Sequence, residues 1–341
     1  MASYEFVNYS LRPAKAIERK MICELMRRLT PFAPIDTYSY IGFGSIFFTD
    51  FVLFHRSLGI TNMCSIEKDA GVVDDDDVQN RFEFNKPFSC IDLQYGTAAD
   101  RLGELADYWA AKTVVWLDYD GRLSDGYISD LGIVMQKALP GSLVMISVNV
   151  KADEKPSSFN GSTKEFRFKR LQHWLSRTNI PPGTQNINLS TDELIKLCHH
   201  ILDTEVKDTI SKRNGAAPVG ERVSSHQVMN FRYQDGVPML TIGWIITDLS
   251  ADHAGILSSI NSANLPFIRS GAMPFNINTP SLTLKEISWL DSVLHTDVDV
   301  DGNILPPKPN EKRLTPLLRP EDVLEYKQVY RYFPTFAEAI L

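Results

Sequence analysis

Two glycines and one glutamate have the types and the spacing of a nucleotide-binding turn. Gly42 and Gly44 follow an apolar segment at 38–41, and Glu67 follows the next apolar segment, 60–66. Glycines let the backbone approach a ligand, and the amino end of a following helix can face it. An acidic residue at the end of the second strand suits ribose hydroxyls, which need an acceptor there. We therefore expect these three residues to contact a nucleoside-type cofactor.

Position 47 separates two classes of cofactor. A dinucleotide fingerprint needs a third small residue three positions after its second glycine, so that helix and strand can pack closely. Phe47 occupies that position here and would hold the helix away from the strand. Nicotinamide or flavin binding is therefore the weaker hypothesis, and a nucleoside without a pyrophosphate is favoured.

Two carboxylates follow a third apolar segment of this kind, at 113–117. Asp118 and Asp120 would lie at the carboxyl end of a central strand, where open α/β sheets bind their ligands. A carboxylate there can accept a proton from an attacking hydroxyl or orient the acceptor. The alternative is that one of them caps the helix that begins nearby. Asp118 with Asn149 would supply two oxygen ligands, too few to specify a cation site, so we expect no metal.

Strands and helices must alternate to place these residues at one sheet edge. Further strands are expected at 88–93 and 142–148, with helices between the strands, and Asp235-Gly236 predicts a terminal hairpin. Apolar strands that alternate with helices predict a parallel sheet covered on both faces. The sequence thus predicts an α/β fold with five parallel strands followed by an antiparallel hairpin.

The remaining segments divide the chain into three parts. We expect an N-terminal helix within 1–35, a main domain at 36–255 with a helical insertion at 151–221, and a helical C-terminal extension at 256–341. Pro13 suits the first turn of the N-terminal helix. Arg12, Lys15 and Arg19 are expected on its solvated surface, with an anion contact as the alternative.

Composition narrows the class of protein. The 341 residues carry a net charge of −7, with 43% hydrophobic and 23% charged residues, which is typical of a globular chain. The charge argues against nonspecific coating of nucleic acid, although a local basic face remains open. Four scattered cysteines suggest neither a disulfide scaffold nor a metal site. No apolar run is long enough to span a membrane and the start does not match a signal peptide, so we expect a cytoplasmic protein without a membrane partner.

At the glycine turn, at Glu67 and at the two carboxylates after the strand at 113–117, the sequence resembles the class I S-adenosylmethionine-dependent methyltransferases and, more loosely, uncharacterised bacterial O-methyltransferases. The resemblance covers about 36–250. It rests on Ile41-Gly42-Phe43-Gly44-Ser45, Ser65-Ile66-Glu67-Lys68-Asp69, Leu117-Asp118-Tyr119-Asp120-Gly121 and the hairpin around Asp235-Gly236. It implies a Rossmann-like, seven-stranded, mostly parallel sheet whose seventh strand runs antiparallel beside the sixth. It also implies S-adenosylmethionine as the cofactor.

The resemblance gives each site residue a role. Gly42 and Gly44 would lie under the methionine part, Ser45 would also contact the cofactor, and Glu67 would hold the ribose. Asp92, within Ile91-Asp92-Leu93, would flank the adenine, and Asp118 would face the methyl group and the acceptor. The chain has Tyr40 where an acidic residue is common and Ile46 where a third glycine is common. Asp50, one turn into the helix, is the expected contact for the cofactor's ammonium group instead.

The segment 151–177 has the composition of a nucleic-acid contact. It holds seven Lys or Arg against three Asp or Glu, interleaved with Phe166, Phe168 and Trp174. Cations mixed with aromatic rings suit a nucleic acid strand or another anionic substrate. The residues expected to make that contact are Lys164, Arg167, Lys169 and Arg170. A surface helix with its aromatic side packed inward is the competing interpretation.

The predicted function is transfer of a methyl group from S-adenosylmethionine to an oxygen nucleophile, with Asp118 and Asp120 assisting. Base N-methylation in related enzymes commonly uses an Asn/Asp-Pro-Pro-aromatic turn, and Asp118-Tyr119-Asp120-Gly121 is not that turn. A nucleic-acid methyltransferase that uses 151–177 stays open as an alternative. So does an inactive, methyltransferase-like module that senses the cofactor or docks a partner. The sequence does not identify the acceptor, and a homo-oligomer stays open.

Overall fold

The computed structural model describes residues 12–68, 81–263, 265–296, 298–303, 305 and 318–334. Its strands are β1 (Ser39–Gly42), β2 (Asn62–Glu67), β3 (Ile91–Tyr95), β4 (Thr113–Arg122), β5 (Leu143–Asn149), β6 (Val223–Gln234), β7 (Pro238–Asp248) and β8 (Phe275–Ile277). They form one sheet in the order β3-β2-β1-β4-β5-β7-β6-β8. Because the order reverses beside β1, the carboxyl ends of β1 and β4 diverge at a switch point where ligands commonly bind.

The strand directions confirm the predicted fold class. Neighbouring strands from β1 to β5 pair in parallel. The antiparallel seventh strand is present, because β7 lies between β5 and β6 and runs against both. Asp235 and Gly236 form the hairpin turn, where Gly236 has a φ of 143° that a side chain would strain. One strand was not predicted: β8, from the segment expected to be helical, pairs in parallel with β6 and makes the sheet eight-stranded.

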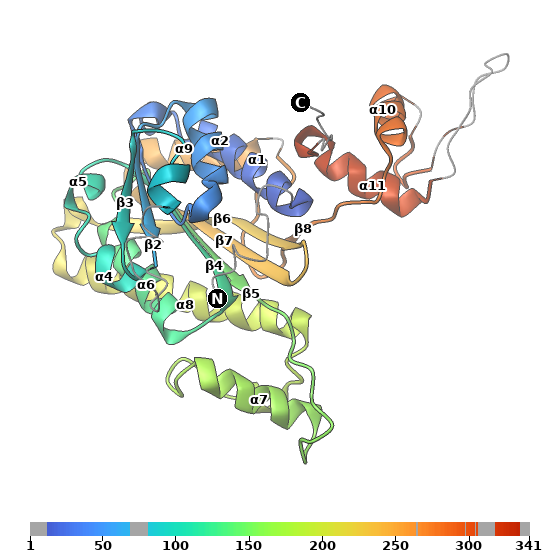
Figure 1. The fold of residues 1–341 in the computed structure, drawn as a ribbon. Helices are drawn as coiled ribbons and strands as arrows, with labels where there is room; N and C mark the ends of the chain where they lie inside the picture. The colour runs from blue at the N-terminus through green and yellow to red at the C-terminus, as the bar shows by residue number, and fades with distance from the viewer. Residues whose placement is uncertain are drawn as a thin grey trace.

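The α-helices are α1 (Pro13–Arg27), α2 (Thr49–Leu58), α4 (Ala98–Arg101), α5 (Ala106–Trp109), α6 (Asp125–Lys137), α7 (Thr163–Trp174), α8 (Thr191–Ala216), α9 (Ala251–Ser262), α10 (Leu284–Val293) and α11 (Pro320–Val329). One face of the sheet packs against α1, α2 and α9, and the other against α4, α5, α6 and α8 (Figure 1). Alternate strand residues serve the two faces, as Tyr40 and Ile41 do in β1.

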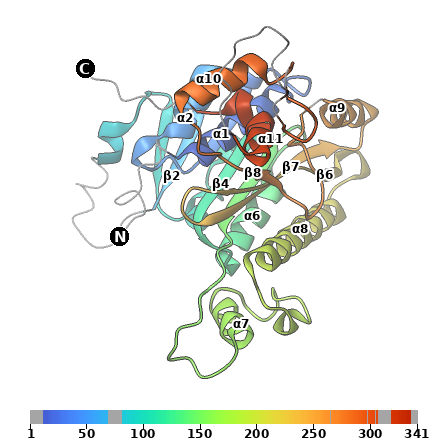
Figure 2. The ribbon, with the colours of Figure 1, turned by 90° about the vertical axis from the view of Figure 1, so that its right-hand side faces the viewer.

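Two parts stand off from this three-layer body. The helix α7 projects below it on long connections, as Figures 1 and 2 show, and none of its residues is fully buried. The helices α10 and α11 share a small core of their own, formed by Leu290, Leu294, Val323 and Tyr326. The predicted cap of α10 is confirmed, since Thr283 and Glu286 form a reciprocal capping box. Within the described ranges, no helix has both the length and the apolar character to cross a membrane.

Candidate functional site

A cavity of about 590 Å³ opens at the carboxyl ends of the central strands. Its volume lies within the range of roughly 300–1,000 Å³ that is usual for small-molecule sites. Six of the predicted site residues line it: Gly44, Ser45, Asp50, Glu67, Asp118 and Asp120. The fold therefore brings together residues from the turn after β1 and from β2, β4 and α2 that are up to 76 positions apart in the sequence.

Glu67 is the most completely positioned carboxylate of this pocket. Its Oε1 accepts a 2.6 Å hydrogen bond from the Ser65 hydroxyl, and the Ser65 oxygen accepts one of 2.8 Å from the Gly44 backbone amide. The side chain is only 6% exposed. Burial raises the pKa of Glu67 to about 7, against the hydrogen bonds from Ser65 and the turn that lower it. A carboxyl group fixed in this way can accept hydrogen bonds from a ligand and titrates near neutral pH.

The two glycines of the turn make room for the protein's own side chains. A Cβ atom at Gly44 would lie 2.4 Å from Phe48 and 2.8 Å from the Ser65 oxygen, and one at Gly42 would lie 2.6 Å from the Tyr40 hydroxyl. Gly42 is absent from the pocket lining, while Gly44 contributes to it. The expectation that Gly42 lies under a ligand is therefore corrected, because the Tyr40 side chain occupies the space beside its backbone; for Gly44, which lines the pocket, the expectation stays a prediction.

Asp50 reaches the pocket from the first turn of α2. Its carboxylate accepts a short hydrogen bond from the Tyr40 hydroxyl, so Tyr40 lies beside an acidic group without being one. Burial raises the pKa of Asp50, and the nearby Arg19 guanidinium opposes that shift. The guanidinium of Arg19 and the carboxyl group of Asp50 thus both line the pocket, close enough to interact electrostatically.

Asp118 is paired with a lysine that the sequence did not place in the site. The Lys15 Nζ lies 2.6 Å from Asp118 Oδ1. Burial alone would raise the pKa of Asp118, but Lys15 and then Arg19 outweigh burial and hold that pKa below its usual range. The capping alternative is wrong, because Ser124 caps α6. Asp120 is exposed at the pocket rim.

The prediction that Arg12, Lys15 and Arg19 form a solvated surface is wrong. Lys15 is 1% and Arg19 is 6% exposed, and both Arg12 and Arg19 line the pocket. Their spacing carried a usable signal, since Lys15, Glu18, Arg19 and Ile22 follow the i, i+3, i+4, i+7 pattern of one buried face. This buried face was not predicted because three of its four residues are charged, and charged residues are buried only when partners from elsewhere in the fold surround them.

Aromatic rings form another wall of the pocket. Tyr119 and Tyr127 stack with centroids 3.6 Å apart and an interplanar angle of 7°, and Phe43 packs on Tyr119 at 5.1 Å. The Tyr119 hydroxyl donates to Asp130 over 2.6 Å. Flat aromatic walls of this kind suit a planar ring system.

Asp92, expected beside this region, lies outside the pocket. It is exposed near the start of β3 and accepts hydrogen bonds from Gln94 and Tyr108. The pocket is instead lined by residues 96–99, which follow the carboxyl end of that strand. The expected third strand ended two residues too early, at 93 rather than 95, so the prediction selected a residue before the edge.

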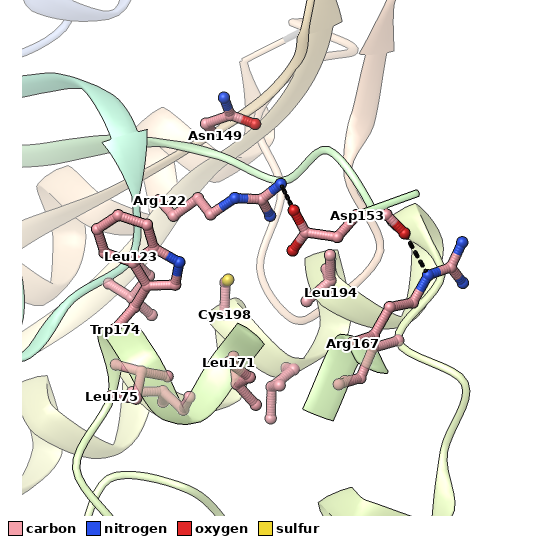
Figure 3. Close-up of a pocket in the computed structure, with 13 residues that line it drawn as sticks. Arg122, Leu123, Asn149, Asp153, Arg167, Leu171, Trp174, Leu175, Leu194 and Cys198 are labelled. Atoms are coloured by element: carbon pink, nitrogen blue, oxygen red, sulfur yellow. Dashed lines mark hydrogen bonds and ion pairs between the residues drawn. The ribbon is translucent and has the colours of Figure 1, made fainter. Parts of the chain in front are cut away.

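A second, smaller cavity separates α7 from α8 (Figure 3). In it Asp153 accepts a hydrogen bond from Arg122 at 2.9 Å, while the Asp153 backbone carbonyl accepts one from Arg167 at 2.8 Å. Asn149 lines this cavity, and its side-chain oxygen accepts from the Lys151 amide, so Asn149 does not pair with Asp118. Among the described residues, no group of three or more His, Cys, Asp or Glu side chains is arranged to hold a metal ion.

The basic residues of 151–177 are partly engaged within the protein. Arg167 also donates to the Asn188 carbonyl, and Arg170 lies 3.9 Å from Asp153. Lys169 lies 5.3 Å above the Phe159 ring. The competing interpretation of a surface helix describes α7 in part, since Phe166 and Phe168 are half-buried while Trp174 is 38% exposed. Contact with a nucleic acid through Lys164 and these three cations stays a prediction.

Comparison with known proteins places the chain in a family. The model of a family described as "Putative O-methyltransferase" matches residues 7–341. A comparison with curated proteins gives no match.

Three solved structures are similar in part. The O-methyltransferase from Bacillus cereus in complex with SAH is 11% identical, with a TM-score of 0.36, covering 71% of this chain and 86% of that one. Trm1 from Pyrococcus horikoshii with S-adenosyl-L-methionine is 9% identical, with a TM-score of 0.41, covering 74% and 59%. The O-methyltransferase TomG from Streptomyces achromogenes in complex with SAM is 12% identical, with a TM-score of 0.33, covering 72% and 93%.

Proposed function

Because this chain belongs to the family described as "Putative O-methyltransferase", we propose that its pocket binds S-adenosylmethionine and that the methyl group passes to an oxygen nucleophile. The observation that carries the proposal is the fixed carboxylate of Glu67 in the same pocket as Asp118. Glu67 can accept hydrogen bonds from the ribose hydroxyls of the cofactor, and Asp118 can orient the hydroxyl group that receives the methyl group.

The pocket residues fit the three parts of this cofactor. Glu67, held by Ser65 and the turn, supplies a buried acceptor for the two ribose hydroxyls. The stacked Tyr119 and Tyr127 rings offer a flat wall for the purine. The amino-acid end carries an ammonium group and a carboxylate, and Asp50 and Arg19 offer the opposite charges.

When bound, S-adenosylmethionine supplies an electrophilic methyl group on a sulfonium centre, so the protein's task is alignment and exclusion of water. Asp118 is suited to orienting a hydroxyl, because its lowered pKa keeps it ionised while making it a weak general base. The helix α1 closes one side of the pocket with Arg12 and Arg19, which limits the access of water. We therefore assign Asp118 an orienting role in place of the proton-accepting one that the sequence suggested.

Binding and turnover can be tested separately. Isothermal titration with S-adenosylhomocysteine should show saturable binding by the wild-type protein. Glu67→Gln should weaken it about tenfold, the loss expected for one hydrogen bond to a charged group. Asp92→Asn is the matched control and should bind normally, because Asp92 lies outside the pocket. No binding by the wild-type protein would end the proposal.

The acceptor can be found with the same protein. Incubation with methyl-tritiated S-adenosylmethionine and a fractionated cell extract should label one fraction. With a carbon-13-labelled methyl group in place of the tritiated one, the chemical shift of the transferred carbon then distinguishes oxygen from nitrogen or sulfur. Binding without labelled product in any fraction would favour the inactive sensor. A product methylated on nitrogen would refute the oxygen nucleophile while leaving the cofactor assignment intact.

A further inference from the structure

Lys15 is buried at the junction of α1 with the pocket. Its Nζ lies 2.6 Å from Asp118 Oδ1, 2.8 Å from Glu18 Oε2 and 3.0 Å from the Tyr233 hydroxyl. It also lies 4.1 Å above the centre of the Trp116 ring. The side chain is 1% exposed, so these four groups replace nearly all of its hydration. The position of the ammonium group is therefore fixed from several directions.

Stability alone is a weak reason for this arrangement. A buried ion pair commonly contributes less to folding than well-packed apolar residues of the same volume. Burial raises the pKa of Glu18 despite the Lys15 ammonium beside it. Asp118 shifts the other way, so the favoured charged pair is Lys15 with Asp118. Of these two carboxylates, Asp118 lines the pocket, and Lys15 stabilises its negative charge.

We infer that Lys15 is a positioning residue of the methyl-transfer site, which holds Asp118 ionised and directs both Asp118 and Tyr233 at the acceptor. This inference rests on the proposed function, because it specifies how the same site orients its substrate. Lys15 donates to Asp118 Oδ1, and the same carboxylate lines the pocket, where an acceptor hydroxyl can reach it. Tyr233 accepts from Lys15 with its oxygen and keeps its own proton to donate, and it lines the pocket.

The turn of the terminal hairpin holds Lys15 in place. Asp235 accepts hydrogen bonds from the Ala14 and Lys15 backbone amides, at 3.0 and 2.8 Å. These amides belong to the first turn of α1, which has no intrahelical acceptors for them. The β6–β7 hairpin therefore fixes the start of α1, and through it the lysine, against Asp118 in β4.

Several other groups influence the charge of Asp118. They come from α1, α2, β1 and β6, and they are Glu18, Arg19, Asp50, Tyr40 and Tyr233. Of these only Arg19 is a cation, so removal of Lys15 leaves Asp118 facing two carboxyl groups with one positive charge nearby. Its pKa should then rise.

The experiment measures the pKa of Asp118 directly. Carbon-13 NMR of carboxyl-labelled aspartate in the full-length protein with S-adenosylhomocysteine follows its titration, with Asp118→Asn to assign the signal. Lys15→Met should raise this pKa by about two units, the range expected when an opposite charge is lost. Lys15→Arg should keep most of the depression. Lys20→Met is the matched control, because Lys20 lies on the same helix and donates to the Phe333 carbonyl.

A second variant guards against loss of the fold. Lys15→Met/Glu18→Leu removes both charges of the α1 pair and should also raise the pKa of Asp118. A purely structural role would lower the melting temperature of these variants while leaving that pKa in place, and such a result would overturn the inference. Methyl transfer to the labelled fraction should fall with its acid limb moved to higher pH. If the wild-type protein did not bind the cofactor, the proposed function would be wrong. The effect of Lys15 on the pKa of Asp118 could still be measured in the protein without ligand, so the two failures are distinguishable.

Discussion

Two basic segments of this protein differ in how the fold surrounds them. The cations of α1 were expected on a solvated surface, and those of 151–177 were expected to contact a nucleic acid or another anionic substrate. In the structure, Lys15 and Arg19 are buried beside the pocket, whereas α7 projects from the body with no fully buried residue (Figure 1). The number of cations in each segment does not explain this difference.

The difference lies in what the rest of the fold brings to each segment. Asp118 from β4 and Tyr233 from β6 surround Lys15, so the charge is paired as it is buried. Around α7 the main acidic partner is Asp153, which contacts Arg122 and Arg170 at the surface. A cation is buried where distant strands supply partners, and it stays at the surface where they do not. The following predictions test this contrast, from the largest effect to the smallest.

The carboxylates that pair with the two segments should differ most in activity. Asp118→Asn should lower methyl transfer by about 100-fold or more, because the acceptor hydroxyl loses the group that orients it. Asp153→Asn should leave it nearly unchanged, because Asp153 lies in the smaller cavity beside α7. Labelled-methyl transfer to the identified fraction measures both. Equal losses in the two variants would contradict the contrast.

The caps of the two helices should differ in stability. Asp235→Ala removes the acceptor for two amides of α1 and should lower the free energy of unfolding by about 2 kcal/mol. Ser162→Ala removes the cap of α7 and should lower it by less than about 1 kcal/mol, since α7 packs loosely. Urea unfolding followed by circular dichroism gives both values. A larger effect for Ser162→Ala would show that α7 contributes to the stability of the main body.

Two arginines offer a matched test of cofactor binding. Arg19→Gln should weaken S-adenosylhomocysteine binding about tenfold, because the ligand's carboxylate loses a charged donor. Arg170→Gln, on α7, should change the dissociation constant less than about twofold, as is usual for an exposed ion pair. Isothermal titration at one fixed salt concentration compares them. Normal affinity in Arg19→Gln would remove Arg19 from the proposed binding site.

The affinity for S-adenosylhomocysteine should depend on pH through Glu67. Its pKa is raised to about 7, so the free protein binds a proton there below pH 7. A protonated carboxyl accepts ribose hydroxyls poorly, so affinity should fall as pH decreases, by about tenfold from pH 8 to pH 6. Glu67→Gln should be weaker at pH 8 and should lose this dependence. A persisting dependence would assign the titration to another group.

The predicted nucleic-acid contact carries the smallest expected effect. Arg167 and Arg170 already contact protein groups, while among the described residues Lys164 and Lys169 form no ion pair. Lys164→Gln/Lys169→Gln should weaken binding of labelled dT15 about threefold and reduce the salt slope by about 1.4. Fluorescence anisotropy at several salt concentrations measures this. An unchanged slope would exclude these two lysines from the contact.

Much of the fold could be predicted from local pattern. Apolar runs located the five parallel strands, and Asp235-Gly236 located the hairpin, because strand burial and turn chemistry are short-range properties. Boundaries were less accurate, and the early end of the third strand led to Asp92 instead of residues 96–99. The short β8 has only three residues, too few for a pattern, and exists because the edge of β6 was available for pairing.

The sequence by itself determined the order of the strands along the chain, the acidic residue after the second strand and the carboxylates after the fourth. Those features follow from periodicity and spacing, which act over a few residues. Only the tertiary structure decided that Tyr40 and Phe48 fill the space beside the glycines, and that Lys15 lies against Asp118. Lys15 and Asp118 are 103 positions apart. Whether a charge is buried depends on partners that the completed sheet brings together, and no local pattern specifies them.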